Sequence, residues 1–358
     1  EFGTEAPELM EILGGSMDAE DFEDHEVLET FYREAESYLD QRSANDPFFL
    51  FLSLTAPHTP TSPGEKWQGK SELGVYGDFV MEVDHAVERV MNALKAKGLD
   101  ENTLILFASD HGSAPYSGNI LKATPGQIKR LEEVGHYPSG PYRGYKFSFY
   151  EGGLRVPLIA HWPGVIPKGT TCDSLVGLCD LMATFADLTD QELGGNEAPD
   201  SISFAPLLRD PNGKATRTNL VMESTMHFAI RDGDWKLCLS PASGITALSE
   251  NGVGNDPLPQ EAWSKALKRF GGKPTDVDLL KAPFVQLYNL ASDPSETNDL
   301  ADSHPDQVGR LVALLQEQVK NGRSTPGPKL ENDKQVHIVN LNDRRLPSIL
   351  KDFKSPKE

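Results

Sequence analysis

Two hydrophobic patterns alternate along the first part of the chain. Largely apolar runs occupy residues 48–54 and 104–107, and such runs predict strands that are buried on both faces of a parallel sheet. Between them, apolar residues recur every three or four positions from Tyr76 to Lys97, which predicts a helix that ends at Gly98. The order strand, helix, strand predicts a right-handed crossover unit of a parallel sheet.

The same patterns extend on both sides of this unit. Apolar residues at helical spacing predict a helix over about 26–41 and another over 175–188, and an apolar run predicts a strand over 155–162. These elements continue the alternation of strands and helices that is typical of an α/β domain.

The pattern changes after about residue 200. Residues 229–239 are typical of a β-hairpin that turns at Asp232 and Gly233, and residues 286–290 are typical of a short strand. Residues 304–320 place their apolar side chains on one face of a predicted helix. The sequence therefore predicts a small antiparallel sheet with a packed helix, an α+β appendage.

Polar residues follow the apolar run at 104–107. Asp110, His111 and Gly112 come next, and in open α/β sheets ligands bind at the carboxyl ends of the strands. A carboxylate and an imidazole suit a divalent cation, and hard oxygen ligands favour Ca²⁺ or Mg²⁺. We expect Gly112 to let the backbone turn sharply behind them. The alternative is a polar turn in which Asp110 caps a following helix.

Two further side chains are candidates for contact with an anion. His58 lies between Pro57 and Pro60 on a stiff backbone, where it could contact an anion or shuttle a proton, although a structural hydrogen bond is the alternative. Lys146 lies among aromatic residues in a long polar segment, and such segments often form a functional wall or lid. The alternative is a surface lysine.

Two other residues, together with the 112–145 loop, are weaker candidates. His227 and Arg231 could line a pocket for a leaving group, but a structural role is the simpler expectation for each.

The composition and net charge argue against some classes of binding partner. The chain has 358 residues, 38% hydrophobic and 25% charged, as expected for a soluble globular protein. Its formal net charge of -20 argues against nucleic-acid and anionic-membrane partners, because both require a basic surface. The three cysteines provide neither a disulfide framework nor a zinc site, and no apolar run has the length of a membrane span.

A set of short motifs is distributed over about residues 30–320. They are Pro47–Leu50, Ala56–Pro60, Tyr76–Asp78, Val83–Asp84, Asp100–Leu104, Ser109–Gly112, Arg143–Lys146, Glu151–Pro157, Trp162–Gly164, Gly233–Lys236, Leu287–Leu290 and Asp293–Thr297. Together these motifs closely resemble the arylsulfatase family of the alkaline-phosphatase-like superfamily. They occur in family order, which makes the ordered set far more specific than any one motif.

The resemblance implies a hydrolase that cleaves sulfate monoesters, with sulfated carbohydrates as plausible substrates, at a Ca²⁺-bound formylglycine. Asp110 and His111 match metal ligands of the family, with Mg²⁺ the poorer fit, whereas His58 and Lys146 match residues that contact the sulfate group. Metal, imidazole and ammonium together would offset the negative charge of the ester and of its transition state. Export to the periplasm or the cell exterior is a further implication.

The resemblance also implies a fold. The expected class is α/β, with a mostly parallel sheet sandwiched by helices and a C-terminal α+β subdomain of antiparallel strands and a packed helix. The expected divisions are an incomplete sulfatase domain over 1–215, the subdomain over 216–325 and a tail over 326–358.

The sequence departs from the family pattern at the nucleophile. The family carries a Cys/Ser-x-Pro/Ala-x-Arg motif and an Asp-Asp metal pair upstream of the segment that matches His58, and we expect this sequence to lack both. Cys172, Cys179 and Cys238 also lack the arrangement. We therefore expect a C-terminal portion of a sulfatase, inactive alone, whose nucleophile and remaining metal ligands belong to an N-terminal part of the same protein.

Two other functions share many of these features. A phosphodiesterase or phosphonate monoester hydrolase of the same superfamily would use a similar metal site. A degenerate homologue without a nucleophile would instead bind sulfated glycans without cleaving them.

Overall fold

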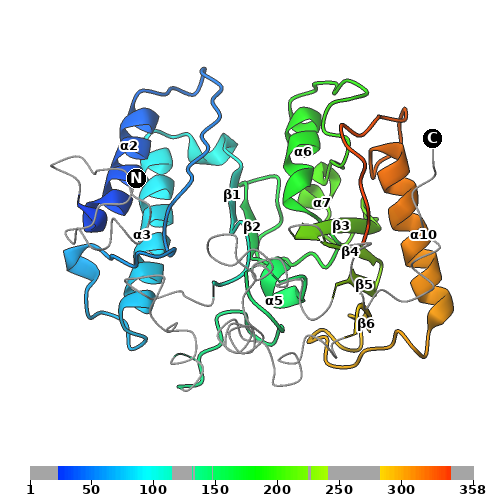
Figure 1. The fold of residues 1–358 in the computed structure, drawn as a ribbon. Coiled ribbons are helices and arrows are strands. Elements are labelled where there is room, and N and C mark those ends of the chain that lie inside the picture. Colours follow the sequence, from blue (N-terminus) through cyan, green and yellow to red (C-terminus); the bar gives the residue numbers. More distant parts are fainter. Residues whose placement is uncertain are drawn as a thin grey trace. The chain divides into compact units, whose positions relative to one another are not determined.

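A computed structural model describes residues 23–114, 131, 134–146, 148–224, 227–240 and 283–339 (Figure 1). The chain forms two compact units. The first comprises Glu1–Ile105, Ala114–Pro138 and His161–Gly164, and the second comprises Leu106–Ser113, Ser139–Ala160 and Val165–Glu358. The domain boundaries expected near residues 215 and 325 stay predictions.

Two helices dominate the first unit. After a short 3₁₀ turn, η1 (Asp24–Glu26), helix α2 (Val27–Asp40) packs along α3 (Val75–Ala96), as Figure 1 shows. The contact buries apolar residues from both helices and from the chain that follows them, namely Leu39, Leu94 and Leu99, with Phe48, Leu50, Val90 and Ile105 packed against them. Two more 3₁₀ turns, η2 (Glu65–Trp67) and η3 (Asp100–Asn102), flank α3. Both helices predicted from apolar spacing are confirmed.

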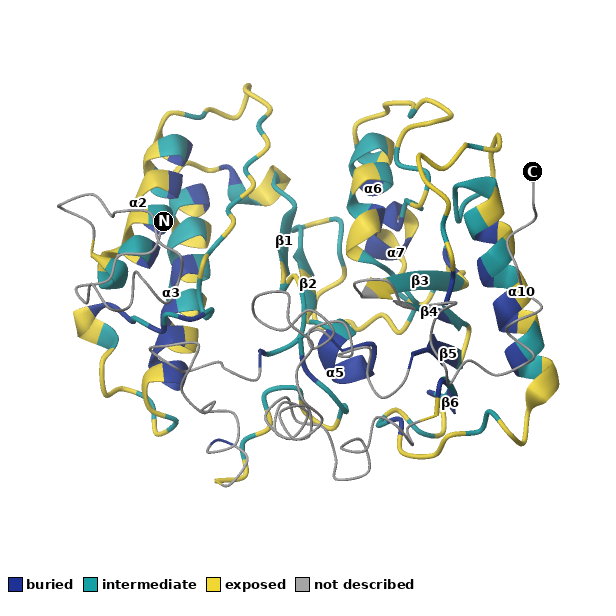
Figure 2. Ribbon diagram, viewed as in Figure 1, coloured by how far each residue is buried: buried dark blue, intermediate teal, exposed yellow. Residues whose placement is uncertain are grey.

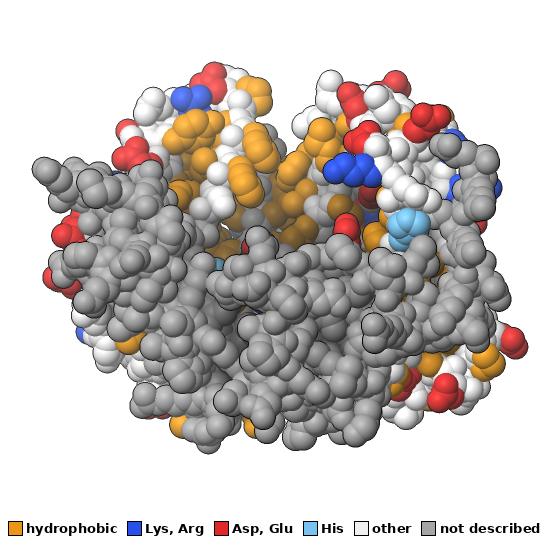
Figure 3. Space-filling view, in the orientation of Figure 1, with side chains coloured by type: hydrophobic (Ala, Val, Ile, Leu, Met, Phe, Trp, Pro, Cys, Tyr) orange, Lys and Arg blue, Asp and Glu red, His pale blue; other side chains and the backbone are white. Residues whose placement is uncertain are grey.

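The strand predicted over residues 48–54 was wrong. The segment belongs to neither sheet of the described chain, because it forms no hydrogen-bonded ladder with another described segment. It is also not buried on both faces, since Phe49 and Phe51 are 68% and 79% exposed while their neighbours are half-buried. Figure 3 shows that some hydrophobic side chains, drawn in orange, are on the surface of the molecule. A run of Phe and Leu indicates apolar surroundings, but a strand also requires a pairing partner.

The second unit contains short elements around the predicted strand ends. Strands β1 (Ile105–Ala108) and β2 (Leu158–His161), of which all residues except Ile105 and His161 belong to this unit, pair in a two-stranded sheet, which confirms both as strands. The helices are α5 (Glu151–Leu154), η4 (Leu178–Asp180), α6 (Leu181–Leu188) and α7 (Ala205–Arg209). Helix α6 begins later than predicted, because the preceding turn is 3₁₀. The mostly parallel sheet expected for the α/β domain stays a prediction.

The C-terminal part of this unit is an antiparallel sheet covered by one helix. Its strands, β3 (Asn219–Ser224), β4 (His227–Asp232), β5 (Trp235–Leu239) and β6 (Val285–Asn289), pair in sequence order. The β4–β5 register, Asp232 opposite Trp235, matches the predicted hairpin. Helix α10 (Pro305–Asn321) packs Leu311 and Leu315 onto the sheet. The predicted α+β subdomain architecture is confirmed.

Some predictions fall outside the described residues. Much of the 112–145 loop lies there, as does the greater part of the tail expected over 326–358. Among the described helices, none combines the length and apolar character that a membrane crossing requires.

Candidate functional site

The turn after β1 presents Asp110 and His111. Ser109 Oγ donates to the His111 carbonyl oxygen at 2.7 Å, and the His111 N–H donates to Asp110 Oδ1 at 3.0 Å, so the turn is closed by its own side chains. No helix follows within residues 111–114, which excludes the alternative that Asp110 caps a following helix. The Asp110 side chain is 81% exposed and therefore accessible to a ligand.

The imidazole of His111 is oriented by the backbone. Its Nδ1 lies 2.9 Å from the Gly112 carbonyl oxygen. Because a carbonyl oxygen only accepts, Nδ1 carries the proton and Nε2 of a neutral ring carries the lone pair. Nε2 lies 3.2 Å from Asp110 Oδ2. Two electron-pair donors at this separation require a positive charge between or beside them, supplied by a proton or by a metal ion.

The donor set fits part of a cation site. A carboxylate oxygen and a neutral imidazole nitrogen held by a second hydrogen bond are common metal ligands. Ca²⁺ takes six to eight ligands. Within the described part of the chain, no group of three or more His, Cys, Asp and Glu side chains is placed to hold a metal ion. Asp110 and His111 could thus contribute to a cation site that further ligands complete.

Glycines allow three backbone segments to meet beneath this turn. The Gly112 N–H donates to the Gly153 carbonyl oxygen at 2.9 Å, and the Gly152 N–H donates to the Arg143 carbonyl oxygen at 2.7 Å. A Cβ added at Gly112 would overlap the carbonyl oxygen of Gly152, and one at Gly152 would overlap that of Gly144. Gly112 was predicted to provide a sharp turn; what the structure requires of it is close backbone contact.

Lys146 is attached to the same turn. Its backbone N–H donates to the Ser113 carbonyl oxygen at 2.9 Å, and its side chain is half-buried. Its described neighbours Tyr145, Ser148 and Phe149 are buried. The structure therefore brings the backbone of Lys146 to the turn that carries Asp110 and His111, on a packed segment.

His58 belongs to the first unit. Its backbone N–H donates to the Thr55 carbonyl oxygen at 3.1 Å, and its Nδ1 lies 2.6 Å from the Thr59 carbonyl oxygen. The half-buried ring is thereby held with Nδ1 protonated, which fixes its tautomer.

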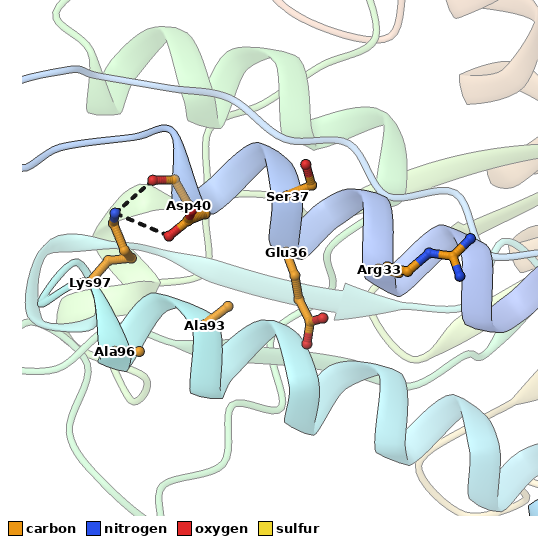
Figure 4. Close-up of a pocket in the computed structure, with 7 residues that line it drawn as sticks. All are labelled: Arg33, Glu36, Ser37, Asp40, Ala93, Ala96 and Lys97. Carbon is orange, nitrogen blue, oxygen red and sulfur yellow. Dashed lines mark hydrogen bonds and ion pairs between the residues drawn. The ribbon is translucent and has the colours of Figure 1, made fainter.

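A surface groove between α2 and α3 contains none of these residues. It has a volume of about 420 Å³, and its lining residues are Arg33, Glu36, Ser37, Asp40, Ala93, Ala96 and Lys97 (Figure 4). Lys97 Nζ donates to the Asp40 carbonyl oxygen at 2.6 Å and pairs with its carboxylate, while Glu36 pairs with Arg89. Opposite charges thus already pair within and beside the groove, which favours a structural role for them.

Known proteins resemble the chain over most of its length. A family model described as sulfatase matches residues 18–191. An N-acetylgalactosamine-6-O-sulfatase from Bacteroides thetaiotaomicron is 31% identical over 297 residues, covering 82% of this chain and 51% of that protein. A solved structure from a glycosaminoglycan-metabolism locus of that species has a TM-score of 0.66 at 29% identity, covering 83% of this chain and 55% of the other. The chain belongs to the sulfatase family.

Other sulfatases agree with this assignment. Human arylsulfatase D is 36% identical over 184 residues, covering 51% of this chain and 29% of that protein. A solved sulfatase from a Pseudoalteromonas species has a TM-score of 0.62 at 25% identity, covering 85% of this chain and 55% of that one. The chain spans about half the length of the Bacteroides relatives that it matches.

The expectation that the sequence lacks the nucleophile motif was wrong in its letter, because one match to the pattern lies inside the chain. Residues 139–143 read Ser-Gly-Pro-Tyr-Arg and satisfy the spacing, although they follow His58, whereas family order places the nucleophile before it. Ser139 Oγ donates to the Gly152 carbonyl oxygen at 3.2 Å, and Arg143 Nη1 donates to the Glu296 carbonyl oxygen at 3.0 Å. Both ends of the match hold the loop in place, which supports a structural role.

Sequence reasoning assigned no role to a buried charge cluster near the Asp110–His111 turn. Lys236 on β5 lies 2.8 Å from Glu151 and 2.9 Å from Glu296, and all three side chains are buried. The available signal was Lys236 itself, a charged residue within the apolar run of a central strand. Its partners lie far away in the sequence, so local pattern could not identify them.

Proposed function

We propose that the protein made from the complete gene is a sulfuric-ester hydrolase that cleaves sulfate monoesters of carbohydrates. The observation that carries the proposal is the turn after β1, where Asp110 Oδ2 and His111 Nε2 converge at 3.2 Å beside the backbone of Lys146. Membership of the sulfatase family makes sulfate ester hydrolysis the reaction that this turn would serve.

In this proposal Asp110 and His111 hold Ca²⁺, with Mg²⁺ the less suitable ion, together with ligands from outside the described residues. When bound, the cation supplies Lewis-acid stabilisation of negative charge. Lys146 presents its ammonium group to the sulfate oxygens, and the imidazole of His58 contacts the same sulfate group or shuttles a proton. The nucleophile is a formylglycine N-terminal to Glu1, in a segment that these 358 residues do not contain.

Carbohydrate is the proposed leaving group. Support comes from the relative with the longest alignment given above, whose name is N-acetylgalactosamine-6-O-sulfatase. The net charge of -20 also means that an anionic substrate needs local positive charge, which a cation and Lys146 would provide. The proposal includes export to the periplasm or the cell exterior, because large sulfated carbohydrates do not cross a membrane unaided.

Turnover of two synthetic substrates tests the proposal. The protein from the complete gene is supplied with Ca²⁺ and offered 4-nitrophenyl sulfate and bis(4-nitrophenyl) phosphate. We expect release of 4-nitrophenol chiefly from the sulfate ester, and none from residues 1–358 alone. Preference for the phosphate diester would instead support the phosphodiesterase alternative, and binding of sulfated glycan without turnover would support the non-catalytic one.

Replacement of Lys146 by Ala should reduce hydrolysis of 4-nitrophenyl sulfate by about 10²-fold in kcat/KM, because one charged donor to the developing charge is lost. The measurement is steady-state kinetics of the protein from the complete gene. Lys168→Ala, which removes an exposed lysine from the β2–η4 connection, is the matched control and should leave kcat/KM unchanged. Equal activity of both variants would show that Lys146 does not contribute to the site.

A further inference from the structure

The buried cluster of Glu151, Lys236 and Glu296 joins three distant parts of the second unit. Glu151 begins α5, Lys236 lies on β5, and Glu296 follows β6. Lys236 Nζ donates to Glu151 Oε1 at 2.8 Å and lies 2.9 Å from Glu296 Oε1, where the contact is an ion pair without good hydrogen-bond alignment. The Glu151 N–H donates to Glu296 Oε2 at 2.6 Å, which closes the cluster.

A second set of contacts ties the residues that precede Lys146 in the sequence to the same region. Arg143 stacks on Tyr150 with its guanidinium carbon 3.9 Å from the ring centroid, and it donates to the Glu296 carbonyl oxygen. Ser295 Oγ donates to the Pro141 carbonyl oxygen at 2.7 Å. Lys146 therefore lies between two attachments to the segment after β6. Figure 2 shows α5, β5 and β6 as mostly buried elements.

The charges in the cluster support one another. Burial alone would raise the pKa of Glu151, but the charge and hydrogen bond of Lys236, with Arg231 and Arg155, outweigh burial and lower this pKa. Burial alone would lower the pKa of Lys236, and the two glutamates raise it instead. Burial raises the pKa of Glu296. Lys236 thus stays protonated and Glu151 ionised at neutral pH.

A buried charge cluster by itself contributes little net stability to a folded protein. Removing charges from water costs free energy that their attraction repays only in good geometry, and apolar residues of similar volume often stabilise a protein as well or better. What a buried ion pair provides is a specific arrangement, since only one placement of the chain satisfies all three groups. The arrangement specified here is that of the loop on both sides of Lys146.

We propose that Glu151, Lys236 and Glu296 are positioning residues, which hold the 139–155 loop on the antiparallel sheet so that Lys146 is fixed beside the Asp110–His111 turn. The coupling is direct, because the same loop contacts that turn through the hydrogen bonds from Lys146 to Ser113 and from Gly112 to Gly153. The catalytic consequence rests on the proposed function, whereas the fixing of the loop does not.

The test compares Lys236→Met with Arg217→Ala, a variant that breaks a buried ion pair elsewhere in the same unit, in the protein from the complete gene. Trypsin cleaves after Arg143 and Lys146, so cleavage there reports release of the loop. Below the unfolding transition of both variants, we expect cleavage at these bonds to accelerate at least about tenfold in Lys236→Met and to stay at the wild-type rate in Arg217→Ala. Equal rates at these bonds in both variants would overturn the proposal.

Kinetics separate positioning from simple loss of stability. We expect kcat for 4-nitrophenyl sulfate to fall about 10²-fold in Lys236→Met, since a small displacement of a catalytic group has an effect of this size. A triple variant, Lys236→Met with Glu151→Gln and Glu296→Gln, removes all the buried charges and should regain stability but not kcat. Recovery of kcat together with stability would contradict a positioning role.

The proteolysis result also keeps the two proposals distinct. If the wild-type protein cleaves no sulfate ester, the proposed function fails, while the trypsin comparison still decides whether the cluster holds the loop.

Discussion

Replacement of Asp110 by Ala should abolish the proposed sulfate ester hydrolysis, with a loss in kcat/KM of about 10³-fold or more. The carboxylate is one of the two donors that the turn after β1 offers to a cation, and its removal leaves only the imidazole of His111. Because the Asp110 side chain is 81% exposed, truncation should hardly change the free energy of unfolding. A loss of activity would therefore report on the chemistry of the site rather than on folding.

Two measurements on the protein from the complete gene check this prediction. Steady-state kinetics with 4-nitrophenyl sulfate give kcat/KM, and titration calorimetry gives the affinity for Ca²⁺, which should fall in parallel. Asp173→Ala, at an exposed position in the β2–η4 connection, is the matched control and should behave as the wild type. Unchanged Ca²⁺ affinity in Asp110→Ala would show that Asp110 is not a metal ligand.

The local pattern of apolar residues was sufficient to predict the amphipathic helices. α2, α3 and α10 each bury one apolar stripe, and such a stripe is visible in the sequence because side chains three or four residues apart share a helix face. The β4–β5 hairpin was equally predictable, since Gly233 supplies the positive φ that its turn requires.

Local pattern failed where structure depends on distant partners. Residues 48–54 have the composition of a buried strand, yet whether they form one depends on a neighbouring strand that no local pattern specifies. The hydrogen bond from Arg143 to Glu296 spans 153 residues, and nothing near either residue indicates the other. The strand-end turn could be located from the sequence, whereas the supports that fix its neighbouring loop could not.

The same reasoning applies to a second buried pair, Asp180 with Arg217. Arg217 Nε donates to Asp180 Oδ2 at 2.9 Å, and Nη2 donates to Oδ1, in a two-pronged contact that is almost fully buried. Arg217 also donates to the backbone carbonyl oxygens of Asn219 and Asp200. The pair joins the start of α6 to β3 and to the chain before α7.

Replacement of Arg217 by Ala should lower the free energy of unfolding by about 3–5 kcal/mol. The loss is large because Asp180 would keep a buried negative charge without its cation, and the backbone N–H groups of Gly177 and Ile202 that still donate to it do not replace that charge. Urea unfolding of variant and wild type, followed by circular dichroism, measures the change.

A matched substitution at the surface shows why burial decides the size of this effect. Arg310 pairs with Asp232 at 2.5 Å, but its side chain is 47% exposed, so water screens the charges and replaces the lost contact. Arg310→Ala should therefore cost no more than about 1 kcal/mol. Adding Asp180→Asn to Arg217→Ala should restore part of the lost stability, because the uncompensated charge is then gone. Equal losses in Arg217→Ala and Arg310→Ala would mean that the buried pair contributes no more than a surface contact.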